Sequence, residues 1–204
     1  MTTIISQHTL VDMPANWWPA NGGNSLTLYD SYSYDYATLY KNQPNVRVCV
    51  DFLARNIAQL GLHVYKRMEN NDRIRLRDHG LAKLLDLPLP ADYKVTQYRL
   101  LESLMGDLGV YHNAYWMKLR NDNGLFGLLR IPPTFVTVLG NLYPTGYKIT
   151  FIDGPKTFEA VDIVHFRGYN AENAVKGLSP LETLRRILAE EHAAGDYREN
   201  FWGN

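Results

Sequence analysis

The segment His112–Ile131, HNAYWMKLRNDNGLFGLLRI, has the pattern of a β-hairpin and constrains its neighbours. Its two halves, AYWMKLR and LFGLLRI, are rich in aromatic and branched apolar residues, which favour strands. The four residues NDNG lie between them and form a turn that ends in Gly124. The sequence therefore predicts two antiparallel strands here.

Three more strands are expected after this hairpin. Pro132 and Pro133 redirect the chain, and PTG and DGP mark later turns. Alternating or β-branched runs between these breaks predict the strands FVTVL (135–139), YKITFI (147–152) and DIVHFRG (162–168). Residues 110–167 should thus form a mainly antiparallel sheet.

Helical periodicity dominates the region before the hairpin. A helix is predicted over 44–60, then a strand over 62–68, a short helix over 80–87 and a helix that Thr96 caps and Gly109 ends. The first helix has an apolar stripe of Val46, Cys49, Val50, Leu53, Ile57 and Leu60. In the helix that Thr96 caps, the expected inward residues are Leu100, Leu101, Leu104, Met105 and Leu108. Cys49 is interpreted as a small buried hydrophobe.

A long helix closes the chain. Ser179 and Glu182 have the spacing of a capping box, and Pro180 fits the first helical position. The expected inward stripe is Leu181, Leu184, Leu188, Tyr197 and Phe201. The fold class is therefore α+β, a mainly antiparallel sheet with flanking helices that ends in a long C-terminal helix.

Residues 1–43 lack clean periodicity and carry a Tyr-rich run near their end. An extended arm laid over another surface and a loosely ordered leader fit this composition equally well. The first residues do not form a secretion signal, and no apolar stretch approaches the roughly 20 residues of a membrane span.

The charge and cysteine counts exclude some functions. The 21 basic and 21 acidic residues cancel, which argues against a protein that grips phosphates through a general excess of cations. With one cysteine the chain can form neither an internal disulfide nor a cysteine-based zinc site.

No catalytic constellation is visible. Phosphate-binding loops, the G-x-S-x-G elbow and metal-binding histidine pairs are all absent from the sequence. Asp162 and His165 are three apart on a predicted strand and should point to opposite faces. His112 and Asn113 are best explained by hydrogen bonds to nearby backbone. On chemistry alone the chain is therefore not an obvious enzyme, and we expect no catalytic residue, no cofactor and no metal.

Taken in order, these segments resemble the N-terminal, wing portion of a bacteriophage portal protein of the HK97-like family. The resemblance covers about residues 44 to 202 and rests on the order and spacing of six segments. These are VRVCVDFLARNIAQLGLHVY (46–65), HGLAKLLDLP (79–88), TQYRLLESLMGDLGVYHNAYW (96–116), LFGLLRIPPTFVTV (125–138), VDIVHFRG (161–168) and GLSPLETLRRIL (177–188). One departure is His112, where the family pattern has Gly before NAY.

The resemblance implies a wing-like α+β domain over 44–204, preceded by the leader or arm over 1–43, with the stem and clip of the family absent. Its structural motif residues would be Asn113 at the helix-to-strand junction, and Gly177, Ser179, Pro180 and Glu182 at the start of the last helix.

The function implied is that of a structural subunit of a head-to-tail connector. Portal subunits form a homo-oligomeric ring, expected to be a dodecamer, at one capsid vertex of the virion, after synthesis in the cytoplasm of the host bacterium. Expected partners are terminase, capsid and head-tail adaptor proteins, and double-stranded DNA that passes through without sequence-specific binding. No membrane is involved. The alternative is a stand-alone α+β binding domain or a small hydrolase with an unrecognised site.

The capping box gives a first test. Replacing Ser179 with Ala should lower the free energy of unfolding by about 1 kcal/mol, because one helix N–H loses its acceptor. Denaturant unfolding followed by circular dichroism measures this, and an unchanged curve contradicts the assignment.

Overall fold

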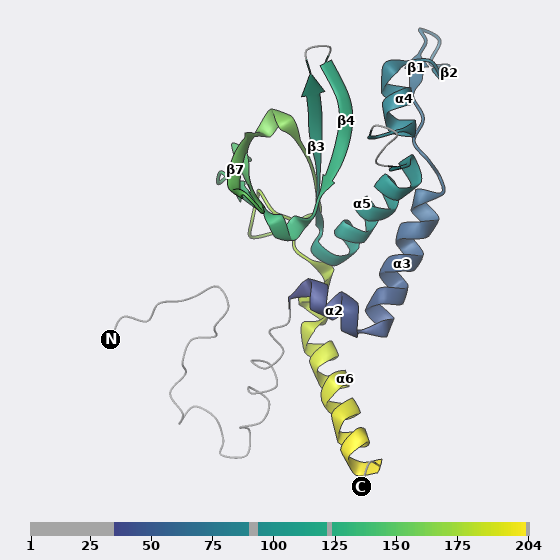
Figure 1. Cartoon of the computed structure of the whole chain (residues 1–204). Coiled ribbons are helices and arrows are strands. Elements are labelled where there is room, and N and C mark those ends of the chain that lie inside the picture. Colours follow the sequence, from purple (N-terminus) through teal and green to yellow (C-terminus); the bar gives the residue numbers. More distant parts are fainter. Residues whose placement is uncertain (1–34, 90–93, 122–123, 203–204) are drawn as a thin grey trace. The chain divides into compact units, whose positions relative to one another are not determined.

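The computed structural model describes residues 35–89, 94–121 and 124–202 (Figure 1). Two compact units make up the chain. The larger is Pro44–Pro180, and the smaller combines Met1–Gln43 with Leu181–Asn204.

The larger unit contains helices and three antiparallel sheets. Its helices are α3 (Pro44–Ala58), α4 (Gly80–Asp86) and α5 (Gln97–Tyr111), with short 3-10 turns η2 (Pro133–Phe135) and η3 (Ala160–Asp162). Its strands are β1 (Tyr65–Arg67), β2 (Arg73–Arg75), β3 (Asn113–Asn121), β4 (Gly124–Ile131), β5 (Val136–Leu139), β6 (Gly146–Phe151), β7 (Gly154–Glu159) and β8 (Ile163–Arg167). The sheet orders are β1-β2, β4-β3-β8 and β5-β6-β7. The predicted α+β class is thus confirmed.

Strand β3 is buried on both faces. Ala114 and Trp116 pack into a core with Leu100 and Leu104 of α5, on the helix side of the sheet. The intervening side chains of β3 point the other way, because side chains alternate along a strand. Alternate buried residues of β3 therefore belong to two different cores, one on each face of the sheet.

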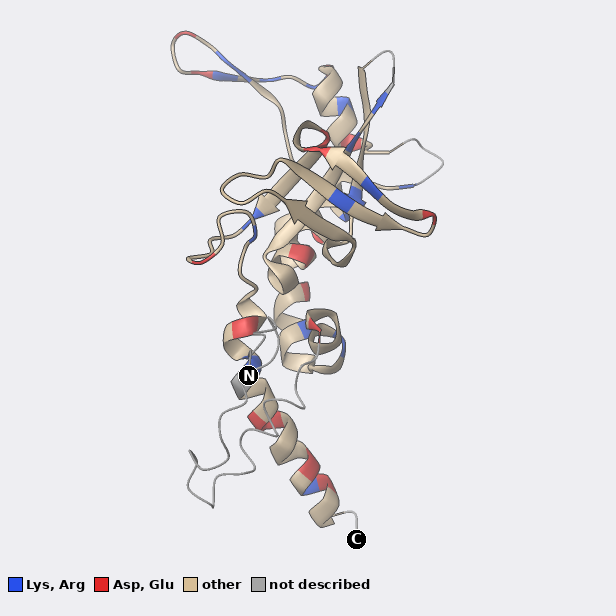
Figure 2. Cartoon of the chain, turned by 90° about the vertical axis from the view of Figure 1, so that its left-hand side faces the viewer, with Lys and Arg blue, Asp and Glu red and all other residues tan. Residues whose placement is uncertain are grey.

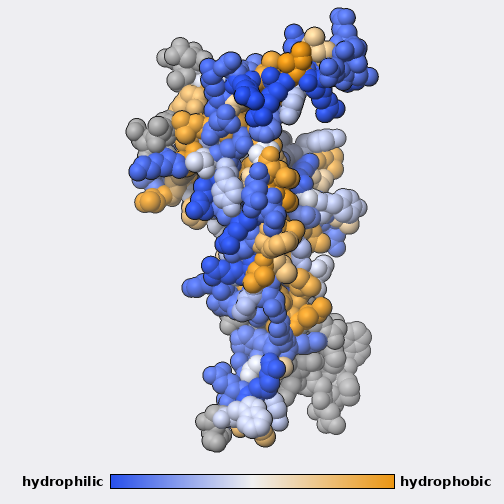
Figure 3. Space-filling model, turned by 90° about the vertical axis from the view of Figure 1, so that its right-hand side faces the viewer, coloured by the Kyte–Doolittle hydropathy of each residue, from blue (hydrophilic) through white to orange (hydrophobic). Residues whose placement is uncertain are grey.

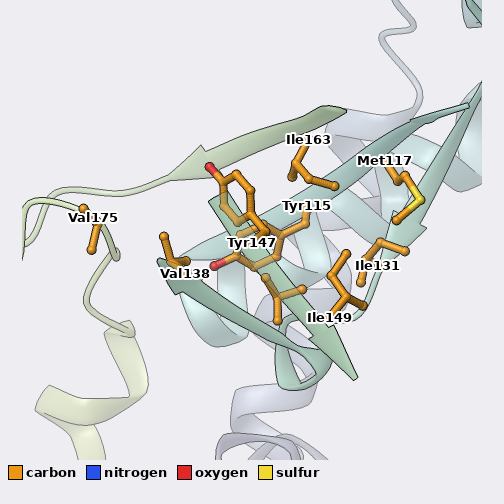
Figure 4. Packing of buried hydrophobic residues seen from close by; sticks show 9 residues of the cluster. Tyr115, Met117, Ile131, Val138, Tyr147, Ile149, Ile163 and Val175 are labelled. Carbon is orange, nitrogen blue, oxygen red and sulfur yellow. The ribbon is translucent and has the colours of Figure 1, made fainter. Parts of the chain in front are cut away.

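The second core lies between the two three-stranded sheets (Figure 4). Tyr115 and Met117 of β3 enter it from one sheet, and Tyr147 and Ile149 of β6 enter it from the other. The rings of Tyr115 and Tyr147 meet edge to face, with centroids 5.9 Å apart. Figure 1 shows the resulting order of layers in this unit, with helices α3 and α5 on one side of the β3–β4 hairpin and β7 on the other.

Helices α3 and α5 pack closely because a glycine lies at their contact. A Cβ on Gly109 would lie 3.1 Å from Cγ1 of Val50. The prediction that Gly109 ends α5 was wrong. The helix continues to Tyr111 and ends at His112, whose φ is 56°. The Thr96 cap is confirmed, since its hydroxyl oxygen accepts from the N–H of Arg99.

The buried face of α3 differs from the predicted stripe. The covered residues are Val46, Val50, Ala54 and Ala58. Cys49 is exposed, and Leu53 and Leu60 are 56% and 76% exposed. The prediction was wrong for these three and for Ile57, which is 36% exposed, because α5 covers the side of the helix where small alanines allow close approach.

Two further differences concern β7 and α6 (Pro180–Trp202). Strand β7 was missed because Pro155 and the preceding turn masked its pattern. It is an edge strand, where the missing N–H of proline is tolerated. In α6 only two of the five residues of the predicted inward stripe are buried. Leu181 and Leu188 are buried, whereas Leu184, Tyr197 and Phe201 are exposed.

The smaller unit pairs α6 with α2 (Tyr36–Asn42). The Tyr36 hydroxyl donates to Glu182 Oε2 at 2.7 Å, and the guanidinium of Arg185 lies 5.8 Å from the Tyr36 ring centroid. Residues before Asp35, including most of the predicted leader, lie outside the described residues.

One charged pair joins α5 to β4. Both oxygens of Asp107 accept from Arg130, at 2.7 Å from Nε and 2.6 Å from Nη2. The Asp107 side chain is 5% exposed and that of Arg130 is 39% exposed. Burial raises the pKa of Asp107 although Arg130 opposes this, and the same pairing raises the pKa of Arg130. The sequence did not predict this pair.

Loss of the buried pair should be costly. Replacing Asp107 with Ala should lower the free energy of unfolding by about 2 kcal/mol, because Arg130 loses two charge-assisted hydrogen bonds. Asp162→Ala is the control. It breaks the exposed Arg120–Asp162 pair, whose atoms are 2.7 Å apart, and should cost less than about 1 kcal/mol. Equal losses in chemical denaturation would contradict the stabilising role of the Asp107–Arg130 pair.

Candidate functional site

Two of the predicted motif residues, Asn113 and Gly177, meet where α5 turns into β3. The side-chain amide of Asn113 bridges to the loop before α6. Its Oδ1 accepts from the N–H of Gly177 at 2.8 Å, and its Nδ2 donates to the Gly177 carbonyl at 2.9 Å. The same Nδ2 donates to the Tyr111 carbonyl at 2.8 Å. Asn113 thus links the end of α5 to a loop 64 residues away.

His112 makes the turn between α5 and β3. Its backbone is left-handed, a conformation in which glycine, the residue of the family pattern, has no steric cost. Two hydrogen bonds hold it there. The ring Nδ1 donates to the Leu178 carbonyl at 2.7 Å, and the His112 carbonyl accepts from the N–H of Gly168 at 2.9 Å. Hydrogen bonds of the His112 ring and carbonyl therefore stabilise a backbone conformation that glycine would adopt without steric cost.

Two glycines leave room for this histidine. A Cβ on Gly168 would overlap the His112 ring, and a Cβ on Gly177 would overlap the His112 carbonyl oxygen. The first overlap is with a side chain and the second with backbone. Gly177 is thus the stricter requirement, because backbone cannot rotate away.

His165 completes the polar cluster from strand β8. Its Nε2 lies 3.2 Å from Asn113 Oδ1, and its ring stacks on Tyr115 with centroids 4.4 Å apart. Because Asn113 Oδ1 accepts from Gly177, Nε2 is the protonated nitrogen. Burial, with smaller contributions from the positive charges of Arg167 and Lys176, lowers the pKa of His165 to about 4. The ring is therefore neutral at pH 7.

The remaining motif residues lie in and beyond this loop. Ser179 is buried and its hydroxyl donates to the Val110 carbonyl at 2.5 Å, a long-range bond that the sequence did not predict. Pro180 is the first residue of α6, as expected. Glu182 belongs to the smaller unit, where it binds Tyr36 and Arg185. Burial raises the pKa of Tyr36 to about 12, and the hydrogen bond to Glu182 and the negative charge of that residue contribute in the same direction.

The side chains of this cluster bond mainly to backbone groups. Asn113, His112 and Ser179 each satisfy backbone groups, and His165 is oriented by Asn113. Within the described residues, no three His, Cys, Asp or Glu side chains are grouped to hold a metal ion. The described part of the chain also has no helix both long and apolar enough to cross a membrane.

A groove of about 660 Å³ opens beside this junction. Apolar side chains of α3 and α5 line part of it, and residues of the junction and of β8 line the rest. The lining residues are Val50, Leu53, Met105, Leu108, Gly109, His112, His165, Phe166, Arg167, Gly168 and Pro180. The groove thus lies against the edge of α3 that α5 leaves uncovered.

The family of the chain follows from its sequence match. The family model of the phage portal protein matches residues 44–204, and the chain belongs to this family. No curated protein matches the sequence. The portal family predicted from the sequence is confirmed.

Solved structures show the same fold. In the neck of an empty gene transfer agent (GTA) particle computed with C6 symmetry, one chain aligns with a TM-score of 0.69 and 19% identity, covering 84% of this chain and 47% of that one. The neck of a native GTA particle computed with C12 symmetry gives a TM-score of 0.65 and 17% identity, with coverages of 84% and 46%. This chain spans about half the length of those it matches.

The junction predicts a strong effect at Gly177. Replacing it with Ala should lower the free energy of unfolding by about 3 kcal/mol, because the new methyl group meets the His112 carbonyl. Gly106→Ala is the control. Nothing lies within 4 Å of a Cβ there, so alanine should stabilise α5 by about 0.5–1 kcal/mol. Thermal melting that shifts equally for both variants would contradict the role given to Gly177.

Proposed function

We propose that the chain is a structural subunit of a homo-oligomeric portal ring at a capsid vertex of a virion, through which double-stranded DNA is packaged and released. Membership of the portal family and the shared fold support this proposal. The proposal includes a dodecamer, synthesis in the host bacterial cytoplasm, binding of terminase, capsid and adaptor proteins, and no enzymatic activity. The described residues contain no feature that favours the alternative of a small hydrolase.

The observation that carries the ring is the uncovered edge of α3. Cys49, Leu53 and Leu60 belong to one apolar stripe, and no described element of the larger unit covers them. Figure 3 views the molecule from the side of α3 and shows apolar side chains running over it. Burial of a leucine is worth about 2 kcal/mol, so exposure of both Leu53 and Leu60 favours association.

The covering surface is assigned to a second copy. A ring closes through heterologous contacts, in which one face of a subunit meets a different face of its neighbour. The turn before β6 carries exposed Leu142 and Tyr143, which supply a second apolar surface in the same unit. The predicted arm over residues 1–43 remains a further proposal for contact between subunits.

A charge placed on this edge should prevent assembly without unfolding the subunit. Leu53→Glu should give monomers by light scattering at concentrations where the unaltered chain associates, with an unchanged melting temperature because Leu53 is already more than half exposed. Ile74→Glu, an equivalent change at an exposed residue of β2, is the control and should still associate.

The chain's one cysteine reports the same contact directly. Cys49 should react with a maleimide in dilute protein and should become protected as rings form, as measured by mass spectrometry. A Cys49→Ser/Glu69→Cys variant, with the thiol in the β1–β2 turn, should stay reactive throughout. The assignment would be overturned by a chain that stays monomeric up to its solubility limit. Protection of Cys49 that persists in monomers and disappears on deletion of residues 1–34 would also overturn it.

A further inference from the structure

We infer that the β1–β2 ribbon binds the phosphate backbone of duplex DNA without reading its sequence. The residues from Val64 to Asp78 include five Lys or Arg on or next to the two strands, and three acidic residues. The acidic residues lie in the turn or beyond β2, so the strands themselves carry only positive charge. In Figure 2 the ribbon shows blue along its strands.

The register places three arginines on one face. Arg67 lies directly opposite Arg73, and Tyr65 lies opposite Arg75. Residues opposite each other, and residues two apart on one strand, share a face of an antiparallel pair. Arg67, Arg73 and Arg75 therefore point to the same side. Lys66 and Ile74 form the other face.

These arginines are oriented but not neutralised. Arg67 donates to Asn71 Oδ1, from Nε at 3.1 Å and also from Nη2, and Arg75 Nη2 donates to His63 Nδ1 at 2.8 Å. Both acceptors are neutral when the imidazole is unprotonated. In the described part of the chain, none of the three arginines forms an ion pair with a carboxylate.

The helix layer of the same unit shows the contrast. Arg47, Arg55 and Arg99 are also exposed, but each pairs with a carboxylate of Asp51 or Glu102 at 2.7 to 3.8 Å. Like charges directly opposite on two strands are destabilising, and a two-stranded ribbon is marginal by itself. The Arg67–Arg73 pair thus favours binding of an anion.

Phosphate suits this face better than a carboxylate surface does. All three cations of the face are arginines, whose planar forks match phosphate oxygens in a bidentate manner. Arg73 and Arg75 are separated by about 6.8 Å, given the strand rise, which is about twice the rise per phosphate of one DNA strand. The inference rests on the proposed function and deepens it, because it assigns the DNA contact to particular residues. All of these residues belong to one chain, so the contact can be tested without the ring.

The test is fluorescence anisotropy of the 204-residue chain with a short labelled duplex of mixed sequence, over a range of salt concentrations. The triple variant Arg67→Gln/Arg73→Gln/Arg75→Gln should bind at least about tenfold more weakly at low salt. The slope of log affinity against log salt should become shallower by about 0.9 for each phosphate that the ribbon no longer neutralises. The variant with Lys at the three positions should keep most of the slope.

The matched control is Arg47→Gln/Arg55→Gln/Arg99→Gln, which removes the same charge from the helix layer and should leave binding unchanged. Equal weakening by the two sets, or no weakening by the ribbon set, would overturn the inference. The inference would also be overturned if poly-L-glutamate competed as well as duplex at equal charge, because the ribbon would then bind acidic protein surfaces. Leu53→Glu should still bind DNA as a monomer. Failure of ring assembly and failure of the ribbon are therefore distinguishable.

Discussion

Strand β3 must bury both of its faces, and the rest of the larger unit follows from this requirement. Trp116 needs a helix layer on one side, and Tyr115 and Met117 need a second sheet on the other. An antiparallel sheet usually leaves one face to water. Here the two cores lie on opposite faces of the β4-β3-β8 sheet, and β3, its central strand, contributes buried residues to both.

Local features of this architecture were accessible from sequence, but the rotation of its helices was not. The β3–β4 hairpin and the Thr96 cap depend on nearby residues, so periodicity and capping chemistry predicted them. Asp122 and Asn123 of the expected NDNG turn lie outside the described residues. The covered edge of α3 depends on tertiary contact, because Gly109 and the alanines of α3 let α5 approach on that side. Periodicity indicates the width of an apolar stripe, whereas packing decides which part of it is covered.

The junction shows the same division between local and distant information. The sequence pointed to Asn113, Gly177 and Ser179, yet no local pattern indicates that Asn113 bonds to Gly177 or that Ser179 bonds to Val110, each more than 60 residues away. His112 was visible as a departure from the family pattern. Its left-handed backbone and its bonds to Leu178 and Gly168 show how a bulky residue replaces glycine. Glycine is then required at the two positions of the following loop that face His112, because its ring and its carbonyl occupy the space where side chains would lie.

The zero net charge of the chain is an average over regions with different roles. Charges on the helix layer are paired, so α3 can present an apolar edge next to neutralised pairs. The arginines of the ribbon have no carboxylate partner among the described residues, so the ribbon keeps unpaired positive charge whereas the pairs of the helix layer cancel. For the ring proposed above this separation is an advantage, since tight phosphate binding over its whole surface would hold the duplex in place. A few arginines per subunit give contacts that are weak, sensitive to salt and repeated around the ring, so that each contact can break while others hold.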